Sequence, residues 1–177
     1  MNWSYPFVHT PDGWSDARGA PDLSNTQYAV LGLHAATKRG VRVPAKTWRS
    51  LIPAILRYQA STTASEDEVG DGLLGFEYRP GGHSPSGSMT AAGIVSLKIC
   101  SLQLDAGLGR RDAVKLEAAI QGGLAWLDHF WTFETTPNPG PNWWSRDHWF
   151  YYVYGLERAG REQHHADALW AQHPFVG

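Results

Sequence analysis

Polar and aromatic side chains suited to a binding or catalytic site recur at the beginnings of three apolar segments. Aligning these segments places Asn25, Met89 and His148 at equivalent positions in the first turns of three expected helices. Backbone N–H groups at a helix beginning carry partial positive charge, so three converging beginnings would suit an anionic or hydroxyl-rich ligand. The neighbouring residues expected to bind it are Asp22, Gln27, Tyr28, His83, Trp144, Asp147, Tyr151 and Tyr152.

Most of these residues also have a purely structural interpretation. Side-chain oxygens at a helix beginning accept the unpaired N–H groups of the first turn. The residues expected to cap the three helices in this way are Ser24, Ser88 and Asp147. Asn25 and Gln27 would equally bind the backbone of a loop. His148 stands beside three aromatic residues, so a buried core histidine is at least as well supported as a catalyst.

The aromatic residues are numerous and unevenly placed. The chain has nine Trp and seven Tyr beside 19 Gly and 11 Pro. The aromatics that stand shortly before the three apolar segments are Trp3, Trp14, Phe76, Tyr78, Trp143 and Trp144. Flat rings there either fill the gaps between helix pairs or line a pocket, where they offer apolar contact with a polar tip.

The three apolar segments repeat at a nearly constant spacing. Residues 24–33 align with residues 88–97 and with residues 147–156, so the unit recurs about every 60 residues. Each segment ends at a glycine suited to a left-handed helix end. These glycines are Gly40, Gly107 and Gly160. A fixed period predicts a helical array whose function lies where equivalent helix ends converge.

The expected helices alternate between two types. The first of each pair is apolar or small around most of its circumference and must be enclosed, whereas the second has a charged outer face. The predicted class is therefore all-α, with stacked hairpins of inner and outer helices over residues 24–59, 88–132 and 147–172. An ordinary bundle of six helices is the alternative. Residues 1–23 are expected to be loop, and residues 71–78 a short extended segment.

Composition limits the class of protein. A chain of 177 residues fits one domain, here residues 1–177, and a net charge of −2 provides no overall field toward nucleic acid or an anionic membrane. No apolar stretch is long enough to span a bilayer, and no secretion signal is visible. A complete chain would be cytoplasmic, but a domain cut from an exported protein would look the same. The lone Cys100 predicts a buried, inert thiol.

The pattern resembles the α/α-toroid of the terpenoid-cyclase and protein-prenyltransferase superfamily, built from prenyltransferase and squalene-oxidase repeats. Residues 71–78 (DGLLGFEY) are similar to its D-G-G-W-G-Y loop. Residues 123–127 (GLAWL) resemble the start of its Gln-Trp repeat, with Trp131 in place of Gln. Residues 151–160 resemble a segment of uncharacterised bacterial toroid proteins. Segments that resemble the Gln-bearing ends of outer helices are 55–59 and 168–172. The likeness begins at Trp14 and implies a partial or complete toroid.

The resemblance also shows what is missing. Protonation-initiated cyclases carry a D-x-D-D-T-A signature, and residues 22–27 of this chain read DLSNTQ. Asp22 and Thr26 match, but Ser24 replaces the aspartate that protonates the alkene, and Asn25 replaces the next one. Protonating a C=C bond needs a carboxylic acid held neutral in a dry pocket, which a serine hydroxyl cannot replace. The sequence therefore predicts no cyclisation of the squalene type.

The zinc-dependent prenyltransferases that the pattern also resembles need Asp, Cys and His ligands on neighbouring loops and helices. Cys100 lies well inside an expected helix, with no adjacent Asp or His. His164 and His165 are consecutive, and consecutive helical residues diverge by about 100°. We therefore expect no metal and no other cofactor.

Two function classes stay open. The first is a non-catalytic toroid domain that binds a small molecule, a carbohydrate or a protein through an aromatic-lined cavity. The second is an enzyme, either a divergent terpenoid-type enzyme or a polysaccharide lyase or hydrolase. Carbohydrate-active enzymes with this fold use Tyr or His to remove a proton beside an Asn. The residues that match these roles are Asn25, His148, Tyr151 and Tyr152. Because a closed toroid needs more than three hairpins, we expect a homodimer or a fragment of a longer chain.

Overall fold

The computed structural model describes residues 7–10, 13–16, 21–61, 73–81, 85–104, 107–137 and 148–161, which form mainly helices. The helices are α1 (Leu23–Lys38), α2 (Ala45–Leu56), α3 (Gly87–Leu104), α4 (Arg110–His129) and α5 (Trp149–Arg161). The strands are β1 (Phe7–Thr10), β2 (Gly13–Asp16), β3 (Gln59–Ser61) and β4 (Leu74–Phe76). The expectation of a mostly helical fold is confirmed.

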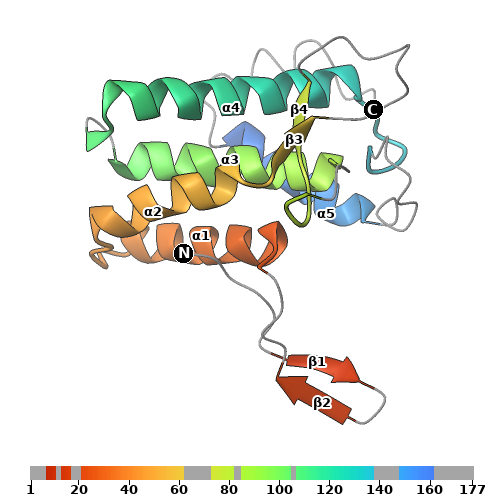
Figure 1. The fold of residues 1–177 in the computed structure, drawn as a ribbon, viewed down its shortest axis with the longest axis horizontal. Helices are drawn as coiled ribbons and strands as arrows, with labels where there is room; N and C mark the ends of the chain where they lie inside the picture. Colours follow the sequence, from red (N-terminus) through yellow and green to blue (C-terminus); the bar gives the residue numbers. More distant parts are fainter. Residues whose placement is uncertain are drawn as a thin grey trace.

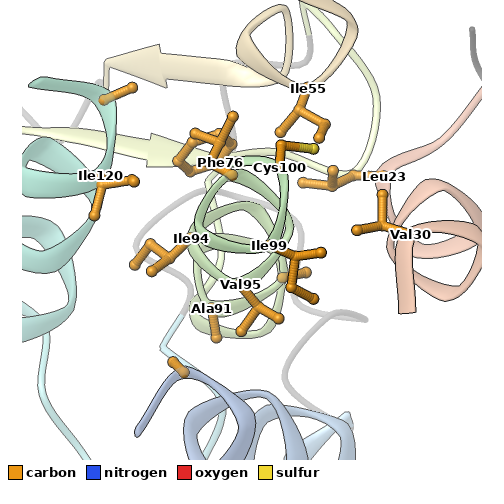
Figure 2. Close-up of a cluster of buried hydrophobic side chains, with 14 of the residues drawn as sticks. Leu23, Val30, Ile55, Phe76, Ala91, Ile94, Val95, Ile99, Cys100 and Ile120 are labelled. Carbon is orange, nitrogen blue, oxygen red and sulfur yellow. The ribbon is translucent and has the colours of Figure 1, made fainter. Parts of the chain in front are cut away.

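Helix α3 lies at the centre, with α1, α2, α4 and α5 packed around it (Figure 1). Its sequence is apolar or small on every face, so only enclosure on all sides keeps these faces from water. Figure 2 shows Ile94 directed toward α4, Ile99 toward α1 and Ala91 toward α5. All three side chains are fully buried. The expectation that this helix is enclosed is therefore confirmed.

The link between α1 and α2 contains a left-handed glycine. Gly40 adopts a φ of 84°, and its N–H donates to the carbonyl of Thr37 at 2.9 Å. The next residue, Val41, donates back to Ala36 at 3.0 Å, which closes the helix end. This glycine has the predicted conformation. Gly160 differs, because α5 continues through it to Arg161, so the helix end expected there is wrong.

Strand β4 is inserted beside the central helix. It pairs antiparallel with β3, and its Phe76 N–H donates to the hydroxyl of Thr90 in α3 at 3.0 Å. The Phe76 ring lies so close to Gly93 that a Cβ there would stand 2.4 Å from it. The extended segment expected within residues 71–78 is therefore present as Leu74–Phe76, and its aromatic ring fills a gap between elements.

The N-terminal region expected to be loop contains two paired strands. Residues 7–10 and 13–16 form the antiparallel pair β1–β2, so the loop expected for them is wrong. A turn signal between two short segments does not reveal whether the segments pair, because pairing depends on backbone hydrogen bonds. Residues 162–172, where the outer helix of the third hairpin was expected, lie outside the described residues.

Candidate functional site

The beginning of α1 is capped by Asp22. One carboxylate oxygen accepts the backbone N–H of Asn25 at 2.8 Å and the hydroxyl of Ser24 at 2.7 Å. The other oxygen accepts the side-chain amide of Asn25 at 2.8 Å. The cap is therefore Asp22 and not Ser24, which lies inside the first turn and helps to orient the carboxylate. Asn25 is held by the same carboxylate, so its role is structural, but its side chain binds a side chain and not the loop backbone that was expected.

The beginning of α3 repeats this geometry with a serine. The Ser86 hydroxyl accepts the N–H of Met89 at 3.4 Å, and its carbonyl accepts the N–H of Thr90 at 2.8 Å. Ser86 is the cap here, and Ser88 is a buried residue of the first turn. The two caps stand two residues before the predicted ones, so the repeat between α1 and α3 has the predicted spacing with a shifted helix boundary.

The third copy has a different register. The carbonyl of His148 accepts the N–H of Tyr152 at 3.0 Å, so His148 occupies the position that Asp22 and Ser86 hold in the other helices. The alignment that made His148 equivalent to Asn25 is therefore wrong by three residues. The shift is less than one helical turn, which an apolar pattern of period 3.6 does not resolve. His148 is exposed, so the core-histidine interpretation is also wrong.

Gln27 and Tyr151 join the beginnings of α1 and α5. The Tyr151 hydroxyl donates to the Gln27 side-chain carbonyl. The rings of Tyr28 and Tyr151 lie with centroids 6.1 Å apart at an interplanar angle of 56°. Gln27 is fully buried, whereas Tyr28 is 53% exposed. Three residues predicted for one site thus lie together, as a cluster with a buried polar side and an exposed aromatic side.

Two buried polar groups near these helix beginnings have unmet hydrogen-bonding capacity. Within the described residues, neither Nε2 of Gln27 nor the hydroxyl of Tyr152 has a hydrogen-bond partner. The Tyr152 ring packs at the beginning of α3, where a Cβ on Gly87 would stand 2.8 Å from it. Burial raises the pKa of Tyr152 well above its ordinary value. The phenol is therefore neutral at physiological pH and a poor proton acceptor.

Of the remaining predicted residues, one lies in the core and the others lie outside the described part of the chain. Met89 is 5% exposed and belongs to the hydrophobic core, so its placement is structural. His83, Trp144 and Asp147 lie outside the described residues. Cys100 is buried in the core, as predicted, and burial raises the pKa of its thiol to about 12.

Sequence reasoning missed two buried residues beside the cap of α1. Burial raises the pKa of Tyr58, and the negative charge of Asp22 adds to this effect, while the nearby Thr26 hydroxyl opposes it. Glu77 is 2% exposed. One of its carboxylate oxygens accepts the N–H of Gly81, and the other has no hydrogen-bond partner among the described residues. The sequence signal that could have identified Glu77 is its position as a single acid inside the otherwise apolar stretch 73–78.

Within the described residues, no group of three or more His, Cys, Asp or Glu side chains is arranged to hold a metal ion. Over the same part of the chain, no helix combines the length and apolar character needed to cross a bilayer. Comparison of the sequence with protein-family models, and of the chain with curated proteins and solved structures, found no match.

Proposed function

We propose that this chain is a non-catalytic helical binding domain that takes a hydroxyl-rich small molecule, of the carbohydrate type, beside Tyr28. The observation that carries the proposal is the cluster of Gln27, Tyr28 and Tyr151. An exposed aromatic ring offers apolar contact to the C–H face of a sugar. The buried Gln27 amide behind it has a donor that is unpaired within the described residues, so a small rearrangement would turn it to a ligand hydroxyl.

The state of the acidic and phenolic groups favours binding over catalysis. Both oxygens of Asp22 are occupied by the helix cap, which leaves that carboxylate no proton-transfer role. Asn25 is bound to Asp22 through both its backbone and its side chain, so it is not placed to neutralise a sugar acid. Burial disfavours the phenolate of Tyr152. Asp22 and Asn25 therefore lack the freedom that a catalytic group needs, and the raised pKa of Tyr152 makes it a poor general base.

The arrangement of the helices supports, as part of the same proposal, a segment of an α/α-toroid. Helices α1 and α5 both pack on α3, and contacts between their first turns join the beginnings of α1 and α5. These three would be inner helices, with α2 and α4 as outer ones (Figure 1). The resemblance to the terpenoid-cyclase and prenyltransferase superfamily implies inner helices whose beginnings converge, so the meeting of α1 and α5 supports this part of the proposal. A second copy, or further residues of a longer chain, would complete the ring.

The proposal is tested by titrating the protein with a panel of neutral and acidic oligosaccharides while backbone amide NMR signals are recorded. We expect shifts at residues 24–31 and 149–155 for at least one sugar. Tyr28→Ala should lower the affinity by about tenfold, equal to about 1.4 kcal/mol. Tyr154→Ala is the matched control. Tyr154 is also an exposed aromatic residue and lies in α5, but its ring packs against Arg158 and not in the Tyr28 cluster.

Three results would contradict the proposal. The first is the absence of any sugar-dependent shift across the panel. The second is binding that maps away from both helix beginnings or is equally sensitive to the control substitution. The third is formation of a product from a bound sugar, which would show that the domain is catalytic.

A further inference from the structure

Positive charge is concentrated at the end of the molecule opposite to the Tyr28 cluster. At this end α1 and α3 finish and α2 and α4 begin, on the left in Figure 1. Eight of the chain's 15 Lys and Arg residues lie here, and all eight side chains are exposed. This basic end consists of Lys38, Arg39, Arg42, Lys46, Arg49, Arg110, Arg111 and Lys115.

Helix α2 is joined to the link before α4 at the basic end. The Arg49 guanidinium in α2 donates to the carbonyl of Gly107, in that link, at 3.2 Å. The cations of α2 therefore lie beside those at the beginning of α4. The acidic side chains described beside them are Asp112 and Glu117, and Glu117 accepts a hydrogen bond from Gln121 at 2.8 Å. Among the described residues positive charge is therefore in excess at this end, although the whole chain carries a net charge of −2.

Several of these cations stand where they disfavour the fold. Arg110 and Arg111 lie in the first turn of α4. Lys46 lies in the first turn of α2, and that turn contains no acidic residue. A helix beginning already carries partial positive charge, so cations there are destabilising. Neither helix has a side-chain cap, because Pro44 and Gly109 occupy the cap positions. A bound polyanion would offset both the side-chain charges and the helix ends.

Exposed aliphatic side chains at the basic end identify the kind of polyanion. Val41, Leu102 and Val114 are 55%, 55% and 62% exposed. Single-stranded nucleic acid is bound by aromatic stacking, but the exposed aromatic rings of the described part lie elsewhere, on α1 and α5. Basic residues combined with exposed aliphatic groups are the composition that binds an anionic lipid surface, with the cations at the headgroups and the aliphatics below them.

We propose that the basic end docks the protein peripherally on an anionic phospholipid surface. Lys and Arg contact the phosphate and carboxylate headgroups. Val41, in the link between α1 and α2, and Leu102, in the last turn of α3, enter the interface. The net charge of the chain does not reveal this surface, because it sums residues from every part of the sequence. The proposal is independent of the ligand beside Tyr28, which lies at the other end.

The test is sedimentation with vesicles of phosphatidylcholine, with or without phosphatidylserine. We expect binding only when phosphatidylserine is present, and weaker binding as salt rises, because salt screens exposed charges. The double variant Arg42→Glu with Arg111→Glu should lower the affinity by at least about tenfold. Its matched control is Arg57→Glu with Arg79→Glu, which changes the net charge equally but leaves the basic end intact.

Further variants separate the alternatives. Val41→Ser should weaken vesicle binding without changing the retention on a cation-exchange resin. Should the first double variant fail to fold by circular dichroism, Lys38→Glu with Lys115→Glu tests the same surface. Vesicle binding that ignores phosphatidylserine, or equal loss in the charge-matched control, would overturn the proposal. Binding to RNA or DNA at physiological salt without binding to anionic vesicles would also overturn it.

Discussion

A buried carboxylate at the beginning of a helix can serve either the backbone or a substrate, and its partners distinguish the two. Asp22 is 1% exposed and receives hydrogen bonds on both oxygens from Ser24 and Asn25. Its negative charge also lies at the positive end of the α1 dipole. Each interaction favours local order at the beginning of α1. Asp22 is therefore a structural group that holds the cluster of Gln27 and Tyr28 in place.

The hydrogen bond from the Tyr151 hydroxyl to Gln27 is expected to stabilise the junction of α1 and α5. Tyr151→Phe removes the donor to a fully buried carbonyl oxygen, and the Gln27 amide nitrogen already has no partner in the described residues. Both polar atoms of Gln27 would then be unsatisfied. We expect the free energy of unfolding to fall by about 1–3 kcal/mol, measured by urea denaturation.

Tyr154→Phe is the control for this change, because Tyr154 is exposed and its ring, rather than its hydroxyl, lies against Arg158. Its unfolding free energy should change by less than about 0.5 kcal/mol. An equal effect in the two variants, or no effect of Tyr151→Phe, would show that the buried bond does not stabilise the junction of α1 and α5.

The caps show why residue-level prediction succeeds only in part. The residue types at positions 22, 24, 86 and 88 are all good caps, so local preference does not choose between them. The choice at α1 is made by a distant segment, because the Leu23 N–H donates to the carbonyl of Tyr78 at 3.1 Å. At α3 the Ser86 N–H similarly donates to Phe76. Contacts between segments far apart in sequence were not available to the local pattern.

Among the elements, α3 and α1 contain glycines whose surroundings are opposite. A Cβ on Gly93 in α3 would stand 2.4 Å from the Phe76 ring, whereas a Cβ on Gly32 in α1 would meet no atom within 4 Å. The first glycine allows a strand to approach the central helix closely. The second lowers helix propensity without any compensating contact. The two positions therefore predict opposite effects of the same substitution.

We expect Gly93→Ala to lower the free energy of unfolding by about 2–3 kcal/mol, because the Phe76 ring is itself fully buried and has no room to move. Gly32→Ala should raise it by about 1 kcal/mol through helix propensity alone. Thermal and urea denaturation of both variants measure these changes. Destabilisation by Gly32→Ala would contradict the open surroundings of that face, and a neutral Gly93→Ala would contradict the close packing of β4 on α3.

The helices are the elements that the apolar pattern predicts best. The predicted hairpin of residues 24–59 contains α1 and α2, and the predicted hairpin of residues 88–132 closely matches α3 and α4. Their apolar periodicity extends over several turns, so the pattern averages out local ambiguity. The strands β1 and β2 are four residues each, too short for such averaging. The third copy fails for a related reason, since aromatic residues surround its helix beginning and make neighbouring registers look alike.

For the molecule as a whole, the two ends of the helices differ in chemistry. The beginnings of α1 and α5 bring together aromatic and amide groups, whereas the opposite end gathers eight cations. The central α3 connects them, because it packs on every other described helix. Composition alone averages over both ends, so the net charge does not reveal this concentration of cations. Which helix ends share a side follows from topology.

The enclosed core also determines how the molecule responds to alkali. Burial raises the pKa of Cys100 to about 12 and the pKa values of Tyr58 and Tyr152 above their ordinary values. The folded state therefore keeps these groups protonated at a pH where the unfolded chain loses their protons. The stability that the raised thiol pKa contributes is fully present below about pH 8.5, the pKa of the thiol in the unfolded chain. This contribution is lost as the pH rises toward 12. The two phenols add to the loss only above about pH 10.

We therefore expect the free energy of unfolding to be level from about pH 7 to pH 8 and to fall by about 2 kcal/mol by about pH 10, measured by urea denaturation. Cys100→Ala isolates the thiol: whatever the substitution costs at pH 7, the decline between pH 8 and pH 10 should become shallower, because the unfolded variant has no thiol proton to lose. A wild-type stability that stays level to about pH 10, or an identical decline in the variant, would contradict the enclosure of Cys100 by the helices around α3.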